Sequence, residues 1–399
     1  MGKISDYTRV LASKLADVFV VDQTDNGTTE TKSATVEQIG TAIGTLQHFA
    51  DLDTSNKNLV DAINEVQGQL YLPATASGAI ATFTTSLAKP LVDCKIGIVA
   101  TGGGGTPTTP IPVVGYTGAN VTRCGKNLFY YSNATRDIYL DSNGDVQSST
   151  SFGVTEYLPV SSQGIRYRGA TDFGNAPCTC YYDKNKTFIS SEHHTVGYGN
   201  LTIPASAVYF RMSFRLADNT TFMIKVGTTP EDYEAYNGTI IPISWQSEAG
   251  TIYGGSLDVT TGVLTKTFEG VDMSTLSWTY NSTDLRWYTS DLALLAVLDY
   301  NNPSFIAEQW NTHAWTGRTE GDIVCNSSGQ VFCLTSDSVN PPEGLLVYEL
   351  ATPVTITGLT PVEITALVGN NNVFTDTNGN TEVTYLETIK EYIDKAINS

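Results

Sequence analysis

The candidate catalytic and phosphate-binding motifs in this sequence each lack a residue that the chemistry requires. Residues 118–127 end in Gly-Lys-Asn, but a phosphate-binding loop needs Ser or Thr after the lysine and a different spacing from the first glycine. No Gly-x-Ser-x-Gly turn, which would expose a nucleophilic serine, occurs in the chain. The sequence therefore indicates neither a phosphate-binding loop nor a serine nucleophile.

Two acidic turns, residues 141–145 and 376–380, resemble the start of a calcium-binding loop. In both, glycine comes at the fourth position, whereas the calcium loop needs it at the sixth. Both turns contain Asn-Gly, which tolerates the positive φ angles of a type I′ turn. We therefore predict two hairpin turns and no calcium site.

The remaining candidates for metal or acid–base chemistry are four histidines and 41 acidic residues. The histidines are His48, His193, His194 and His313. The adjacent pair would point to opposite faces of a strand, and no partner stands at ligand spacing, so solvated loop residues are favoured over a metal site. A glycosidase needs only two facing carboxylates, but no pair stands out. We therefore predict no catalytic residue, no metal and no cofactor.

All five tryptophans lie in the C-terminal half, at Trp245, Trp278, Trp287, Trp310 and Trp315. Exposed tryptophan faces can stack on sugar rings. Packing in a β core is the commoner use of this side chain and is favoured here.

Length and composition predict a polar, acidic protein of several domains. The 399 residues exceed one compact core. Only 16% of residues are charged, and the sequence is rich in Thr, Ser, Asn and Gly instead. A surface of such uncharged polar residues suits long-lived sheets. A net charge of −19 argues against nucleic acid, because binding depends on neutralising phosphates. The same charge disfavours anionic membranes.

No secretion signal or membrane span is predicted. Arg9, Lys14 and Asp17 interrupt the first 21 residues, and no run reaches the roughly 20 apolar residues of a span. We expect a protein made in a cytoplasm that leaves it, if at all, by a route other than secretion. The six cysteines are expected to be free and mostly buried. They are Cys94, Cys124, Cys178, Cys180, Cys325 and Cys333.

Residues 1–44 read as a β-hairpin followed by a short helix. The hairpin turn is Asp25-Asn26-Gly27, and Thr35 with Gln38 forms a capping-box pattern. So small a piece buries little apolar surface, so we expect it to dock on a partner. The apolar residues expected to make that contact are Val18, Val20, Ile39 and Ile43.

Two short helices are predicted, one over residues 54–71 within a segment 45–72 and one over residues 386–399. Both have the apolar spacing of a coiled coil. The first seam is Leu59, Ile63, Val66 and Leu70, and the second is Leu386, Ile389, Ile393 and Ala396. An amphipathic helix packed on its own chain is the alternative for the first. Because short helices are marginal alone, we predict a homotrimer.

The rest of the chain reads as mainly β, with tandem antiparallel sandwiches. Residues 73–119 are expected to hold short strands and a Gly/Pro-rich linker, residues 120–240 a sandwich, and residues 241–385 a second β domain. The clearest strand places four apolar side chains on one face, in alternation with mixed residues. These are Val208, Phe210, Met212 and Phe214.

Several segments resemble bacteriophage virion proteins. Residues 46–66 resemble a segment recurrent in phage tail and head fibres. Residues 125–129 (GKNLF), 182–186 (YDKNK), 203–207 (IPASA) and 227–236 (GTTPEDYEAY) resemble a jelly-roll module of phages and prophages of Gram-positive bacteria. Residues 253–258 (YGGSLD) and 346–350 (LVYEL) resemble a β module that often follows it.

The resemblance implies a non-enzymatic fibre or appendage subunit in the virion, attached to head, neck or baseplate proteins. Residues 1–44 would anchor it, helices would align three chains, and β domains would project outward. A receptor-binding module that recognises cell-surface glycan is the first alternative, because the jelly-roll resembles carbohydrate-binding modules in fold. A polysaccharide depolymerase is the second, although no repeated strand coil is visible.

Overall fold

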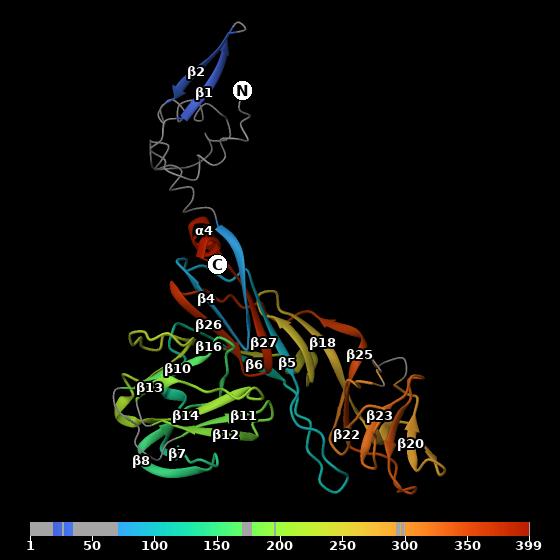
Figure 1. Ribbon diagram of the computed structural model, residues 1–399. Helices are drawn as coiled ribbons and strands as arrows, with labels where there is room; N and C mark the ends of the chain where they lie inside the picture. Colours follow the sequence, from blue (N-terminus) through green and yellow to red (C-terminus); the bar gives the residue numbers. More distant parts are fainter. Residues whose placement is uncertain are drawn as a thin grey trace. The chain divides into compact units, whose positions relative to one another are not determined.

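The structure is a computed structural model of the chain (Figure 1). It describes residues 71–169, 178–194, 197–292, 296, 299 and 301–398, together with the backbone of residues 19–25 and 28–34. The chain divides into two units, residues 1–73 with 386–399, and residues 74–385.

The N-terminal hairpin is confirmed. Strands β1 (Phe19–Asp25) and β2 (Thr28–Ala34) pair antiparallel, with Asp25 opposite Thr28 across the predicted Asn-Gly turn. Val20 lies in β1. The other predicted anchor residues, Val18, Ile39 and Ile43, lie outside the described residues, as do Leu59, Ile63, Val66 and Leu70 of the first predicted seam.

The C-terminal helix begins later than the sequence predicted. Helix α4 spans Ile389–Asn398, whereas Leu386 belongs to strand β27 (Asn378–Thr388). Thr388 and Glu391 form a reciprocal capping box, because the Glu391 carboxylate accepts from the Thr388 amide at 2.7 Å and the Glu391 amide donates to Thr388 Oγ1 at 3.2 Å. This cap fixes the start of the helix, so Leu386 is not part of it. Tyr71, the last residue of the predicted first helix, begins strand β3 (Tyr71–Gly78).

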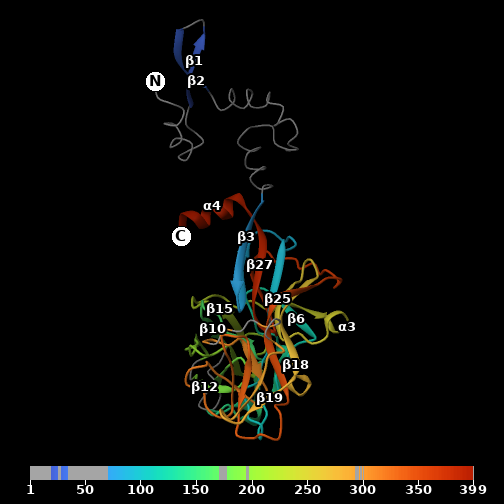
Figure 2. The same cartoon turned by 90° about the vertical axis from the view of Figure 1, so that its right-hand side faces the viewer.

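A central sandwich of two antiparallel sheets forms the middle of residues 74–385. The four-stranded sheet contains, in order, β16 (Thr239–Ser244), β6 (Gly118–Cys124), β26 (Gly369–Thr375) and β4 (Ile80–Thr85). The seven-stranded sheet contains, in order, β21 (Phe305–Ala307), β25 (Leu345–Ile356), β18 (Val263–Asp272), β17 (Gly254–Asp258), β5 (Asp93–Val99), β27 and β3. Figure 2 shows β3 beside β27 at one edge of this sheet.

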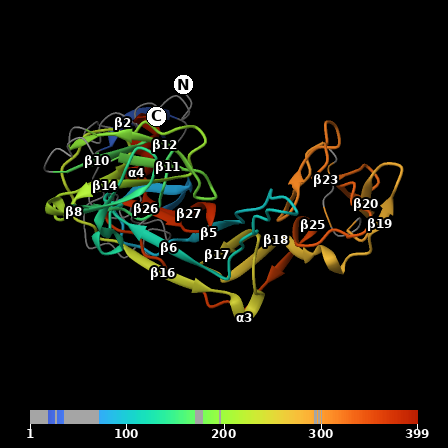
Figure 3. The same cartoon turned by 90° about the horizontal axis from the view of Figure 1, so that it is seen from below.

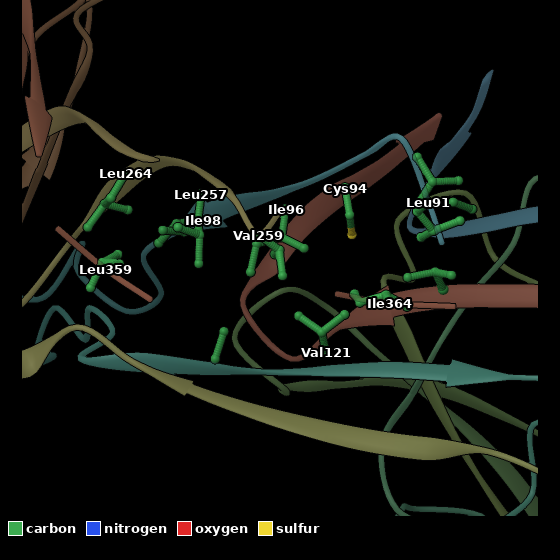
Figure 4. Packing of buried hydrophobic residues seen from close by; sticks show 14 of the residues in the cluster. Leu91, Cys94, Ile96, Ile98, Val121, Leu257, Val259, Leu264, Leu359 and Ile364 are labelled. Carbon is green, nitrogen blue, oxygen red and sulfur yellow. The ribbon is translucent and has the colours of Figure 1, made fainter. Parts of the chain in front are cut away.

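Alternation along β5 explains the core between the two sheets. Cys94, Ile96 and Ile98 are buried, while the residues between them face outward. They pack with Val121 of the opposite sheet and Leu257 of the neighbouring strand (Figure 4). The mainly β fold class predicted from the sequence is thereby confirmed.

Two long insertions interrupt this sandwich. Residues 125–238 separate β6 from β16, and residues 273–344 separate β18 from β25, although each pair consists of hydrogen-bonded neighbours. Figure 3 shows both pairs running side by side. Strands from residues 73–119 therefore pair with strands from residues 241–385, so the arrangement is nested where the sequence suggested tandem domains. The physical reason is that pairing between strands more than a hundred residues apart leaves no local pattern.

The first insertion (mostly green in Figure 1) contains two further sheets. One comprises β12 (Phe188–His193), β11 (Cys178–Tyr182), β14 (Tyr209–Arg215), β8 (Val146–Val154), β7 (Thr135–Leu140) and β9 (Leu158–Pro159). The other comprises β13 (Tyr198–Asn200), β10 (Ile165–Arg168) and β15 (Met223–Val226). Phe210, Met212 and Phe214 are fully buried between them, as predicted. Val208 is only half-buried and packs in a separate cluster.

The second insertion (orange in Figure 1) carries a five-stranded sheet. Its strands are, in order, β19 (Thr279–Asn281), β20 (Arg286–Thr289), β24 (Val331–Leu334), β23 (Asp322–Cys325) and β22 (Asn311–Thr312). One face of β23 and β24 packs with Trp310 and Leu346 in its core. Short helical turns elsewhere are α3 (Gln246–Ala249), η2 (Tyr131–Asn133), η3 (Leu216–Asp218) and η4 (Met273–Thr275).

The Gly/Pro-rich stretch predicted as a linker is docked on the second insertion. The Gly104 amide donates to the Ala307 carbonyl at 2.8 Å, and the Ile111 amide donates to the Glu308 carbonyl at 2.9 Å. A Cβ atom at Gly105 would lie 2.4 Å from the same Glu308 oxygen. Glycine is therefore needed because the two backbones approach each other closely. From the sequence alone, the same glycines look like those of a flexible linker.

Buried cysteines and tryptophans agree with the core role that the sequence favoured. All six cysteines are buried free thiols, and burial raises the pKa of Cys94 to about 12. Trp245, Trp287 and Trp310 are buried, and the other two tryptophans are half-buried. No helix in the described ranges is both long and apolar enough to cross a membrane.

Candidate functional site

Two segments that carry the resemblance, residues 125–129 and 227–236, meet where the first insertion leaves and rejoins the central sandwich. Asn127, 1% exposed, links them. Its side-chain oxygen accepts from the amides of Phe129 at 2.9 Å and Ile224 at 3.2 Å. Its side-chain nitrogen donates to the Glu234 carbonyl at 3.1 Å. These motif residues therefore hold the ends of the insertion together.

Charged residues reinforce the same junction. The Glu231 carboxylate lies between two ammonium groups, with Lys126 Nζ at 2.7 Å and Lys225 also in contact. Hydrogen bonds from Lys126 and Lys225 lower the pKa of Glu231. The Gly125 amide donates to Asn237 Oδ1 at 2.8 Å. The arrangement is internally satisfied, which is typical of a structural clamp rather than a ligand site.

A third motif segment, residues 182–186, leads to a cleft. It forms the turn between β11 and β12, where Asp183 Oδ1 accepts from the amides of Asn185 and Thr187 at 2.8 Å each. Lys186 has a φ of +61° in this turn. Its ammonium lies 5.0 Å from the centre of the Tyr157 ring, which holds the side chain at the cleft wall by cation–π attraction.

The cleft lies between the first insertion and the outer face of the four-stranded sheet, and its volume is about 190 Å³. That outer face carries Thr122, Ile240 and Phe374. They share it because Thr122 lies directly opposite Ile240 on one neighbouring strand and opposite Phe374 on the other. The full lining is Asn120, Thr122, Asn133, Glu156, Tyr157, Pro159, Lys186, Tyr209, Ile240, Phe374, Thr375 and Asp376. Two carboxylates and one ammonium are thus gathered from distant parts of the sequence.

Each carboxylate is oriented by an asparagine. Asn133 Nδ2 donates to both Glu156 oxygens, at 3.2 and 3.1 Å. Asp376 accepts from the amide and the side-chain nitrogen of Asn120, both at 2.8 Å. Burial raises the pKa of Glu156, and the nearby Asp376 charge raises it further, while the Asn133 hydrogen bond opposes the shift.

The tyrosines of the cleft are already engaged. Lys186 and Arg211 each lie 5.0 Å from the centre of the Tyr157 ring. The Tyr209 hydroxyl donates to Asn378 Oδ1, and burial raises the Tyr209 pKa to about 12. The cleft therefore presents carboxylate oxygens and an ammonium group to a ligand, rather than open aromatic faces.

Sequence reasoning missed this cleft, although two of its residues lie in segments it singled out. Lys186 ends the YDKNK segment, and Asp376 begins one of the acidic turns that resemble calcium loops. The first of these turns joins the paired strands β7 and β8, as predicted. The hairpin predicted at residues 376–380 is wrong, because β26 and β27 lie in different sheets and the turn carries the chain from one sheet to the other. No sequence pattern marked Glu156, because its place in the cleft depends on how the folded chain buries it.

The histidine interpretation was partly wrong. His194 is 7% exposed rather than solvated, and its Nε2 atom lies 2.8 Å from Thr179 Oγ1. His193 is exposed, and His313 is half-buried. His48 lies outside the described residues. Across the ranges that the structure describes, no three His, Cys, Asp or Glu side chains are grouped as metal ligands.

Of the predicted oligomerisation residues, Ile389 and Ile393 lie in α4, and Leu386 precedes it in β27. Ile393 is 45% exposed. Apolar side chains exposed on a helix in this way are available to a partner.

Comparison with known proteins gives one partial match. No protein-family model matches the chain, and no solved structure matches it. A stretch of 123 residues is 32% identical to a tail fiber protein of Enterococcus phage phiEF24C. The match covers 29% of this chain and only 7% of that protein. Part of the chain is therefore similar to a phage tail fiber protein.

Proposed function

We propose that this protein is a structural, non-enzymatic subunit of a phage virion appendage. The observation that carries the proposal is the 32% identity over 123 residues to a phage tail fiber protein. The mainly β architecture and the motif segments of the first insertion support it, because they suit a projecting, rigid appendage.

Residues 1–44 are proposed as the virion anchor. Their hairpin is a two-stranded sheet, which is marginally stable without a partner. The predicted contact residues are Val18, Val20, Ile39 and Ile43, and the proposed partner is another virion protein.

Three copies of the chain are proposed to associate through their helices. Tyr392, Ile393 and Ile397 of α4 are 53%, 45% and 76% exposed, and the +4 spacing of Ile393 and Ile397 places these two side chains on one face of the helix. A ten-residue helix is too short to be stable by itself, so a second copy covering this side would stabilise it.

The experiment is detection of the chain on purified virions. Antibody labelling in electron micrographs should place it on an appendage. Deleting residues 1–44 should remove the protein from virions while the β domains of the purified chain keep their circular dichroism and melting temperature. Normal amounts of the truncated chain on virions would refute the anchor. Absence of the full-length chain from virions would refute the proposed function.

The depolymerase alternative is tested separately. Incubation with host polysaccharide should release no new reducing ends. Their appearance, and their loss in a Glu156→Gln variant, would show that the cleft carboxylates act as a catalytic pair instead.

A further inference from the structure

We propose that the cleft between the first insertion and the four-stranded sheet binds a single neutral, hydroxyl-rich sugar residue. Glu156 and Asp376 would accept hydrogen bonds from its hydroxyl groups, and Lys186 would donate to them. The inference deepens the proposed function, on which it rests for the source of the sugar, a glycan at the host surface. Binding itself can be measured on the purified chain.

The two cleft carboxylates keep free acceptor positions. A carboxylate has about four lone-pair positions. Asn133 occupies one on each Glu156 oxygen, and Asn120 occupies one on each Asp376 oxygen. Each carboxylate is thus held in a fixed orientation with acceptor capacity remaining on both oxygens. Neighbouring hydroxyl groups on a sugar ring match such paired acceptors.

The ammonium group of Lys186 keeps donors available to a ligand. Among the described residues it contacts the rings of Tyr157 and Tyr209 rather than a carboxylate. Its three N–H donors are not consumed by an ion pair there. A hydroxyl-rich ligand is both donor and acceptor, so it satisfies Lys186 and the two carboxylates together.

Charge and size restrict the ligand class. The two carboxylates repel an anionic sugar, while the Lys186 ammonium at the cleft wall disfavours a cationic one. A volume of about 190 Å³ is below the roughly 300 Å³ at which pockets for drug-sized ligands begin. A cleft of this size suits a small ligand such as one sugar ring.

The tyrosine rings exclude recognition by stacking. Because Lys186 and Arg211 already lie against the Tyr157 ring, a sugar face has no free aromatic platform here. Selectivity should therefore depend on hydroxyl positions, since a site with placed polar groups rejects ligands that leave those groups unpaired.

Saturation-transfer NMR on the full chain tests the proposal. The probes are glucose, galactose, rhamnose and N-acetylglucosamine, with glucuronic acid and glucosamine as charged comparators. We expect saturation of at least one neutral sugar in the millimolar range. Glu156→Gln and Asp376→Asn should each weaken binding about tenfold, because a hydrogen bond to a charged acceptor is replaced by a weaker one.

Asp337→Asn is the matched control. Asp337, in the second insertion, also accepts from a side-chain and a backbone nitrogen of one asparagine, Asn340, but lies outside the cleft. This variant should bind like the parent, and melting curves will show that all three variants fold.

Several outcomes would overturn the cleft assignment. These are no saturation of any neutral sugar, preference for a charged comparator, or unchanged binding by both cleft variants. A chain that is found on virions but binds no neutral sugar would keep the proposed function and exclude the sugar site. Sugar binding by a chain that is absent from virions would keep the sugar site and exclude the proposed function.

Discussion

Replacing Asn127 with alanine tests whether the GKNLF segment is a structural clamp. The side chain is buried and bridges three backbone groups, the amides of Phe129 and Ile224 and the carbonyl of Glu234. Alanine would leave both amides without their acceptor at the point where the insertion meets the central sandwich.

The magnitude follows from the number of buried donors. A buried polar group that loses its partner costs about 1–3 kcal/mol. Two amides therefore give roughly 2–6 kcal/mol, and we expect a loss of about 4 kcal/mol. That is a large share of the roughly 5–15 kcal/mol by which a domain is stable, so the first insertion should be close to unfolding.

Hydrogen exchange with mass spectrometry is the suitable assay, because a chain of several folding units is not expected to unfold in one step. Peptides from residues 125–238 should lose protection, while peptides from β17 and β18 keep it. Asn219→Ala, at an exposed position in the same insertion, is the control. Parental protection in Asn127→Ala would refute the clamp.

Three further perturbations test other parts of the reasoning. Phe210→Asp should bury an unpaired charge and cost several kcal/mol, seen as a lower melting temperature; an unchanged melt would mean that the strand faces elsewhere. Ile393→Asp should shift the chain from trimer to smaller species by light scattering, and an unchanged mass would refute the α4 contact. Burial lowers the pKa of His194, so its contribution to stability is present above the ordinary value of 6.5 and is lost as pH falls through the lowered pKa. His194→Gln should flatten the decline of melting temperature below about pH 6.5, and an unchanged slope would place that decline in other groups.

Local patterns in the sequence were sufficient to predict local structure. Alternation identified the strand containing Phe210, Met212 and Phe214, and the Asn-Gly pairs at 26–27 and 143–144 identified turns between paired strands. These signals succeed because they depend on neighbours within a few residues. The start of α4 was also readable from the Thr388–Glu391 capping box, but Leu386 fitted the helical spacing and drew the boundary too early.

The cleft could not be predicted in this way. Glu156 follows β8 in the first insertion, whereas Asp376 follows β26 in the central sandwich. Their proximity depends on how the insertion packs against the outer face of the four-stranded sheet, where Phe374 joins the core of the insertion. The same holds for His194, whose burial reflects its contact with Thr179 on the neighbouring strand.

The nested topology gives a reason why the motif segments lie where they do. A module can be inserted between two paired strands without disturbing them only if its two ends lie close together. β6 ends at Cys124 and β16 begins at Thr239, and Arg123 lies directly opposite Thr239 in the pairing. Residues 125–129 and 227–236 occupy these two ends and are joined by Asn127 and by the Lys126–Glu231 ion pair. Residues at this junction must close the insertion, whatever ligand the rest of the module binds. The two junction motifs therefore identify the module. Its ligand specificity would depend on the cleft residues outside these two motifs.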